Sequence, residues 1–167
     1  MSGDRVYYSA SSLTMPPKIY EADLANMTHR VLVDNPLPKE LEGRLGRAYF
    51  TTYKSSDGLE VPAFVVESGA ARKSGPTITY VHGGPWIEVY DQWSIMIASL
   101  SAVGYHVIAT NFRGSTGYGE EYGLLNVGDV GDVGGGDLED IAAAADWARR
   151  TGLASKIAIR GIATGAS

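Results

Sequence analysis

An alternation of strand-like and helix-like segments begins at residue 77 and constrains the fold more than any other feature of the sequence. Short apolar, β-rich runs occur at 77–82, 105–111 and 156–161, and the two stretches between them carry apolar residues at helical spacing. Parallel strands of one sheet need such crossovers, which are right-handed in nearly all proteins. The pattern predicts an α/β fold with a parallel sheet, in which 156–161 is a buried strand.

Both helical stretches have recognisable ends. Asp91 can cap the first, and Gly104 lies just past its end. Asp137 opens the second, and Asp140 also lies where the helix dipole favours an acidic residue. The apolar stripes expected to face the sheet are Trp93, Met96, Ile97, Leu100 and Val103 on the first helix and Leu138, Ile141, Ala142, Ala145 and Ala148 on the second.

Strand signals also precede residue 77. Residues 4–33 consist of short aromatic and β-branched runs separated by turn residues, which predicts a small antiparallel sheet. Prolines and charged residues then indicate a linker at 37–46. Residues 47–68 read as two strands joined at Ser56-Asp57-Gly58, because Asp-Gly favours a tight hairpin turn.

The composition excludes several classes of function. The chain has 167 residues, enough for one domain or part of one, and a net charge of −5 with scattered basic residues, so neither nucleic acid nor a membrane is an expected partner. It has no cysteine, which excludes disulfides, thiolate metal sites and a cysteine nucleophile and fits a reducing compartment. With no signal peptide or apolar span, we expect a soluble, cytoplasmic protein.

Two glycine-rich stretches follow predicted strands. In His82-Gly-Gly-Pro-Trp86 the backbone N–H groups can approach a ligand closely, as an oxyanion hole requires, although the same residues could simply make a tight turn. The stretch 111–122 carries Arg113, which could meet a substrate carbonyl or carboxylate. From spacing alone, an ion pair between Arg113 and Glu120 or Glu121 is the simpler interpretation.

The remaining polar features indicate no metal or cofactor. A repeated Gly-Asp-Val at 128–133 matches neither a phosphate loop nor an EF-hand, so we read it as a loop before the second helix. Of the three histidines, His29 and His106 lie in predicted strands and His82 in the glycine turn. Isolated histidines in such places are more often structural or exposed than catalytic.

Taken together, these runs resemble the prolyl oligopeptidase family of serine peptidases, and most closely its acylaminoacyl peptidase branch. The resemblance is carried in order by "DGLEVPAFVVES", "TYVHGGPW", "NFRGSTGYGEEY", "GGGDLEDIAAAADWA" and "SKIAIRG". It implies that 47–167 form the N-terminal part of an α/β-hydrolase domain. Residues 1–36 would then correspond to the last strands of a β-propeller, with 37–46 as the linker between the two.

The resemblance also implies roles for individual residues. The N–H of Gly84 would be one oxyanion donor and that of Thr164 the second, while His82 and Arg113 would line the substrate site. The family's nucleophile elbow runs Gly-x-Ser-x-Gly-Gly, and here Ala163 stands in the serine position. A less favoured frame, which adds four residues after the strand, would make Ser167 the nucleophile. No Asp or His follows the elbow, so no complete catalytic triad is expected.

These expectations support two hypotheses for function. The first is a truncated or split relative of a serine peptidase, not catalytic by itself, that binds a peptide or acyl-amino acid and depends on a complementing chain. The second is a non-catalytic binding or assembly module that uses the edge strand of its half-sheet to form a homo-oligomer. A fragment with no retained function is a third reading.

Overall fold

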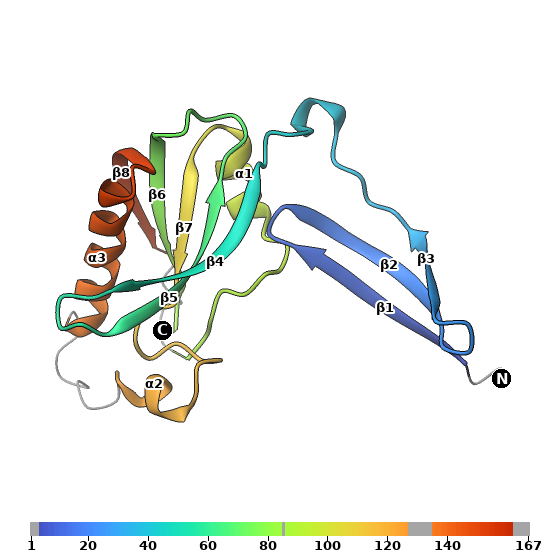
Figure 1. Cartoon of the computed structure of the whole chain (residues 1–167), viewed down its shortest axis with the longest axis horizontal. Coiled ribbons are helices and arrows are strands. Elements are labelled where there is room, and N and C mark those ends of the chain that lie inside the picture. The colour runs from blue at the N-terminus through green and yellow to red at the C-terminus, as the bar shows by residue number, and fades with distance from the viewer. Residues whose placement is uncertain (1–3, 85, 127–134, 162–167) are drawn as a thin grey trace, which may run out of the picture.

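The computed structural model describes residues 4–84, 86–126 and 135–161 and contains two separate sheets (Figure 1). The larger has five strands in the order β4-β5-β7-β6-β8, in which β7, β6 and β8 run parallel and the β4–β5 hairpin joins β7 antiparallel. Its strands are β4 (Arg47–Lys54), β5 (Glu60–Glu67), β6 (Gly75–Val81), β7 (His106–Thr110) and β8 (Ala154–Gly161). The predicted α/β fold, the parallel strands and the hairpin are confirmed.

Two helices cover opposite faces of this sheet (Figure 1). Ile108 of β7 packs with Ala144 and Ala148 of α3 (Gly136–Arg150). Its neighbours Val107 and Ala109 pack in the cluster that contains Ile97 of α1 (Ile95–Ala102). Because successive residues of a strand point to opposite faces, these contacts place the two helices on the two sides of β7. A short third helix, α2 (Glu120–Leu124), lies at the end of the sheet where β7 finishes.

The ends and faces of the helices differ from the prediction in four places. Val103, expected in the apolar stripe of the first helix, lies just past the end of α1 and is 68% exposed. Ser94, not Asp91, caps α1, and its side chain accepts a hydrogen bond from the Ile97 N–H. The second helix begins at Gly136, so Asp137 lies inside its first turn.

The buried face of α3 also differs. Leu138 and Ala142 were expected in the apolar stripe but are exposed, while Asp140 and Ala144 are fully buried. The physical reason is that the carboxylate of Asp140 has internal partners, described below, which turn this side of the helix inward.

The prediction that 156–161 is a buried strand is wrong. Within the described residues β8 pairs only with β6, and most of its residues are exposed, including Ile159 with 61% of its surface accessible. It is an edge strand of the sheet as described. Its β-branched residues therefore predicted the strand correctly but not its burial.

The smaller sheet is antiparallel, as predicted, with the order β1-β2-β3. Its strands are β1 (Arg5–Ser12), β2 (Met15–Asp23) and β3 (Thr28–Val33). One face carries the stacked rings of Tyr8 and Tyr20, whose centroids are 5.1 Å apart. On the other face the carboxylate of Glu21 is shared by Arg5 and Arg30.

The β1–β2 turn connects the small sheet to the large one. Leu13, at this turn, is only 1% exposed and packs in the α1-side core with Val66 and Ile97. Its N–H donates a 2.8 Å hydrogen bond to Oδ1 of Asp91, the residue expected to cap α1. The turn of the small sheet is thus part of the core of the larger sheet, while the β2–β3 turn projects away from it (Figure 1).

The segment between the sheets contains a short 3-10 helix, η1 (Lys39–Leu41), and a buried Leu45 that packs against Ala98 and Ala102. None of the helices that the structure describes is long and apolar enough to cross a membrane.

Candidate functional site

The two glycine-rich stretches leave the sheet at the same edge. Val81, the last residue of β6, lies beside Thr110, the last residue of the parallel strand β7. The stretches 82–90 and 111–122 therefore start next to each other at the carboxyl ends of parallel strands, where α/β proteins place their ligand sites. Spacing along the chain could predict this juxtaposition but not the contacts within it.

Gly84 has a backbone conformation that requires glycine. Its φ is +127°, and a Cβ there would lie 3.1 Å from the Trp86 nitrogen. Among the described residues no backbone carbonyl accepts a hydrogen bond from its N–H. The role of Gly84 as an oxyanion donor stays a prediction.

His82 fixes the start of this loop. It is 7% exposed, its Nε2 lies 3.0 Å from the Ser115 hydroxyl, and its Nδ1 lies 2.7 Å from the Gly83 carbonyl oxygen. The ring also stacks on Phe112 with centroids 4.5 Å apart. Burial lowers the pKa of His82, so the neutral ring is favoured. Since both nitrogens have partners, His82 holds the glycine turn against the neighbouring loop.

Asn111 holds the other end of the loop, and sequence reasoning missed it. Its side chain is fully buried, and its Oδ1 accepts a 2.7 Å hydrogen bond from the Val89 N–H. Its Nδ2 donates to the Val89 carbonyl at 2.8 Å and to the Tyr118 hydroxyl at 2.7 Å. The amide thus engages both backbone groups of one residue, as a neighbouring strand would. Its position directly after a buried parallel strand was the available signal.

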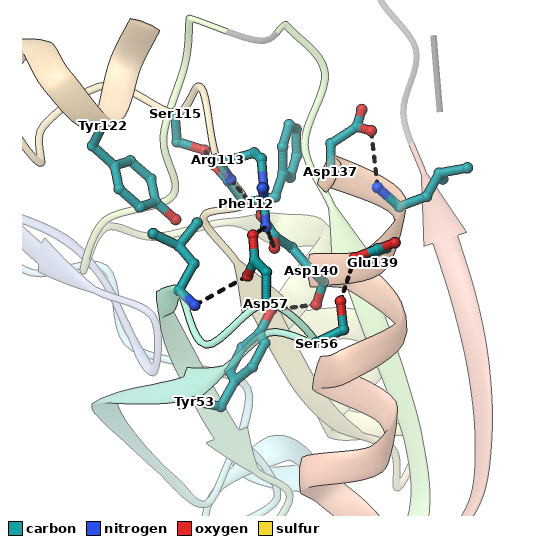
Figure 2. Close-up of polar contacts among 12 residues, drawn as sticks. Tyr53, Ser56, Asp57, Phe112, Arg113, Ser115, Tyr122, Asp137, Glu139 and Asp140 are labelled. Atoms are coloured by element: carbon teal, nitrogen blue, oxygen red, sulfur yellow. Dashed lines mark hydrogen bonds and ion pairs between the residues drawn. The ribbon is translucent and has the colours of Figure 1, made fainter. Parts of the chain in front are cut away.

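Arg113 lies across the beginning of α3, and Figure 2 shows its guanidinium facing Asp140. Its Nη2 lies 2.8 Å from Oδ1 of Asp140 and 2.9 Å from Oδ2 of Asp57. Its backbone N–H and Nε both donate to Oδ2 of Asp140, at 2.8 and 3.0 Å. The expected ion pair with Glu120 or Glu121 is wrong, because the loop turns the guanidinium back toward α3.

The surroundings of this ion pair confirm that it is internal. Asp140 is fully buried, the Arg113 side chain is 13% exposed, and the Tyr53 hydroxyl donates to the Asp140 carbonyl. The hydrogen bonds with Asp140, above all, raise the pKa of Arg113. A side chain on Gly136 would collide with the guanidinium, which explains the glycine there. A direct contact between Arg113 and substrate stays a prediction.

The other predicted site residues lie elsewhere. Ala163, Thr164 and Ser167 fall outside the described residues, as does the whole Gly-Asp-Val repeat at 128–133. His106 is a buried structural residue that accepts a hydrogen bond from the Ser68 N–H, and His29 lies on β3. In the three described ranges, no group of three or more His, Asp or Glu is placed to hold a metal ion.

Comparisons with known proteins agree on one family. The prolyl oligopeptidase family profile matches residues 91–167. Acylamino-acid-releasing enzyme 1 of Oryza sativa is 36% identical over 113 residues, which are 65% of this chain and 14% of the relative. Dipeptidyl aminopeptidase BIII of Pseudoxanthomonas mexicana is 33% identical over 122 residues, 68% of this chain and 15% of the relative.

A solved structure extends the similarity to almost the whole chain. The crystal structure of a puromycin hydrolase superposes with a TM-score of 0.76 and 26% identity, covering 96% of this chain and 25% of the hydrolase. The matched part of the chain corresponds to about one seventh of the length of the Oryza sativa and Pseudoxanthomonas mexicana relatives.

The Arg113–Asp140 pair gives a testable prediction for stability. Replacing Arg113 with alanine leaves a buried carboxylate without its cation, so we expect the free energy of unfolding to fall by about 3–5 kcal/mol. Arg149→Ala removes the exposed pair with Asp146 and is the control, with an expected loss of less than about 1 kcal/mol. Urea denaturation measures both. Equal, small losses would contradict the assignment of a buried, structural ion pair.

Proposed function

The chain belongs to the prolyl oligopeptidase family, and from this premise we propose that it forms the oxyanion-loop part of a serine-peptidase site. The observation that carries the proposal is the geometry of Gly84. Its left-handed backbone lies between two fixed points, His82 and Val89, at the carboxyl edge of the parallel sheet. Pre-organised N–H groups in this position stabilise the oxyanion that forms when a serine attacks an amide. Thr164 would supply the second donor.

The proposed substrates are acyl-amino acids and short peptides. The names of the relatives point to hydrolysis beside an amino-acid residue: acylamino-acid release, dipeptidyl aminopeptidase activity and puromycin hydrolysis. For this chain the class remains a proposal, since it spans only a small part of each relative.

We further propose that the 167-residue chain does not catalyse the reaction by itself. Alanine occupies position 163, where the elbow needs its nucleophile, and a methyl group cannot attack a carbonyl. Removing the nucleophile of such a triad costs several orders of magnitude in rate. His82 is held by Ser115 and Gly83, so it is not placed as a general base. Catalysis would need a serine, a histidine and an acid that come from outside these 167 residues.

The N-terminal sheet fits the same proposal. We propose that 1–36 correspond to the last strands of the family's β-propeller, 37–46 to the linker and 47–167 to part of the hydrolase domain. The three-stranded antiparallel meander supports this assignment. A cytoplasmic location is proposed on the absence of cysteine.

A second candidate function is assembly through the sheet edge. In the described residues β8 has one strand neighbour, and Ile159, which belongs to this strand, is 61% exposed. An edge strand of this kind offers unpaired N–H and C=O groups to a second copy or another chain. Sedimentation velocity tests this directly: a dimer or larger species supports it, and a stable monomer over the whole concentration range contradicts it.

The catalytic proposal predicts that a fluorophosphonate probe leaves the purified chain unlabelled and that N-acetyl-alanine p-nitroanilide is not hydrolysed. The reason is the missing nucleophile at Ala163. Mass spectrometry of the intact protein measures labelling, and Ser167→Ala is the matched control because it removes the alternative nucleophile. Labelling that disappears in Ser167→Ala would place the nucleophile at Ser167 and overturn the proposal.

A further inference from the structure

The small sheet ends in an open strand edge at β1. In the described residues β1 has a single strand neighbour, β2, and its residues 5–9 are all exposed. The other end of the strand is held against the segment before α1, where the Ser11 hydroxyl accepts a hydrogen bond from the Trp93 N–H. Figure 1 shows the outer part of β1 projecting away from the larger sheet. Residues 5–10 are therefore open to another strand.

This edge lacks the features that keep edge strands apart. Edge strands are commonly protected against pairing by lysine, proline or a β-bulge. Residues 5–10 contain no lysine or proline, and they pair with β2 without a register shift until Ala10. Val6, Tyr7 and Tyr8 are 44%, 59% and 40% exposed, and valine and tyrosine favour strands. The outer part of β1 thus presents a regular edge with a high propensity to pair.

The other strand edges that the structure describes carry such protection. β3 has an extra residue, Leu32, relative to its partner β2, and a bulge of this kind bends a strand and disrupts pairing. β8 contains Lys156, and β4, at the opposite side of the larger sheet, ends at Lys54. Among these edges, β1 is the least protected.

The side chains of β1 point alternately to the two faces of the small sheet. Val6 and Tyr8 lie on the aromatic face, where Tyr8 is directly opposite Tyr20 of β2. Arg5 and Ser9 lie on the charged face. A strand that extends this sheet must therefore offer apolar residues to the first face and polar residues to the second.

The sequence of β1 meets this requirement with its own copy. When two antiparallel copies are centred on Tyr7, Val6 of each lies opposite Tyr8 of the other, and Arg5 lies opposite Ser9. Directly opposite residues share a face, and pairs of an aromatic with a β-branched residue are favourable. No like charges are opposed, because Arg5 is the one charged residue of β1. The strand is thus self-complementary in this register.

We propose that this edge is a dimer interface, in which β1 strands of two copies of the chain pair antiparallel about Tyr7. The two three-stranded sheets join into one sheet of six strands. Its aromatic face continues from Tyr20 and Tyr8 of one copy to Val6 of the second copy. Contacts of this two-fold kind are the commonest between identical chains. The interface uses neither the glycine loop nor β8, so it is independent of the proposed function.

Single cysteines test the pairing, because the chain has none of its own. Tyr7→Cys places two thiols across the two-fold axis, where the Cβ atoms of directly opposite residues are about 4.5–5.5 Å apart. This separation is close to that of a disulfide. We expect most of this variant to form a disulfide-linked dimer under mild oxidation at micromolar concentration, measured by gel electrophoresis without reductant.

Three further cysteine variants locate the contact. Ser9→Cys lies on the same strand and face, but its two thiols would be about 14 Å apart, so it should stay unlinked. Met27→Cys, at a position that is 86% exposed, measures random collision. Equal linking of these two variants and Tyr7→Cys would overturn the proposal. Linking of Ile159→Cys without linking of Tyr7→Cys would also overturn it and would place the assembly at β8.

Opposite charges at Ser9 test the same register without a covalent bond. In the proposed dimer Ser9→Glu faces Arg5 of the second copy with an opposite charge, and Ser9→Lys faces it with a like charge. Relative to the wild type, we expect the first variant to tighten and the second to weaken the dimer dissociation constant about 3- to 10-fold, because each dimer contains two such pairs.

Sedimentation velocity measures the dissociation constants, and circular dichroism shows whether each variant is folded. Ser9 is exposed, so both substitutions are compatible with the fold of one copy. A wild-type chain that stays monomeric at every concentration would contradict the interface. Shifts of the same sign in the two variants, or no shift in either, would contradict it as well.

Discussion

The turn after β7 is the constraint on which the rest of the site depends. Within five residues, Asn111 binds Val89, Phe112 and Ser115 hold His82, and Arg113 pairs with Asp140 and Asp57. These contacts fasten three separate parts of the chain, namely the glycine loop, helix α3 and the β4–β5 turn, to one strand end. A backbone N–H can stabilise an oxyanion only if it is held in place beforehand, and this turn supplies the support.

The buried ion pair explains how α3 sits on the sheet. Bringing Asp140 and Arg113 out of water is costly, so the pair contributes more to selecting one orientation of the helix than to net stability. With its carboxylate fully buried, Asp140 turns inward and leaves Leu138 on the surface. The same arginine also contacts Asp57 in the hairpin turn, which links the antiparallel and parallel halves of the sheet.

The alternation of strands and helices was readable from the sequence because hydrophobic periodicity is local. The partners of polar residues could not be predicted in the same way. Asp140 lies 27 positions from Arg113, and nothing near it in the sequence indicated that Arg113 would pair with it instead of Glu120 or Glu121. The prediction that Asp91 caps α1 was wrong for a similar reason. Its Oδ1 accepts a hydrogen bond from the N–H of Leu13, which lies in the β1–β2 turn far away in the sequence. The exposure of β8 depends on its sheet neighbours, which its own residues do not encode. The domain boundaries and the roles of Ala163 and Thr164 stay predictions.

The central claim is that the turn at 111–115 holds the glycine loop at 82–90, the proposed oxyanion loop, in place, and amide hydrogen exchange in Asn111→Ala measures this most directly. Loss of the side-chain acceptor should speed exchange of the Val89 amide by about 10-fold, the effect of one hydrogen bond of about 1.4 kcal/mol, beyond any change at Ile108 in the core of β7. The Ile108 amide serves as the internal reference for global unfolding. Equal changes at Val89 and Ile108, or none at Val89, would contradict the account.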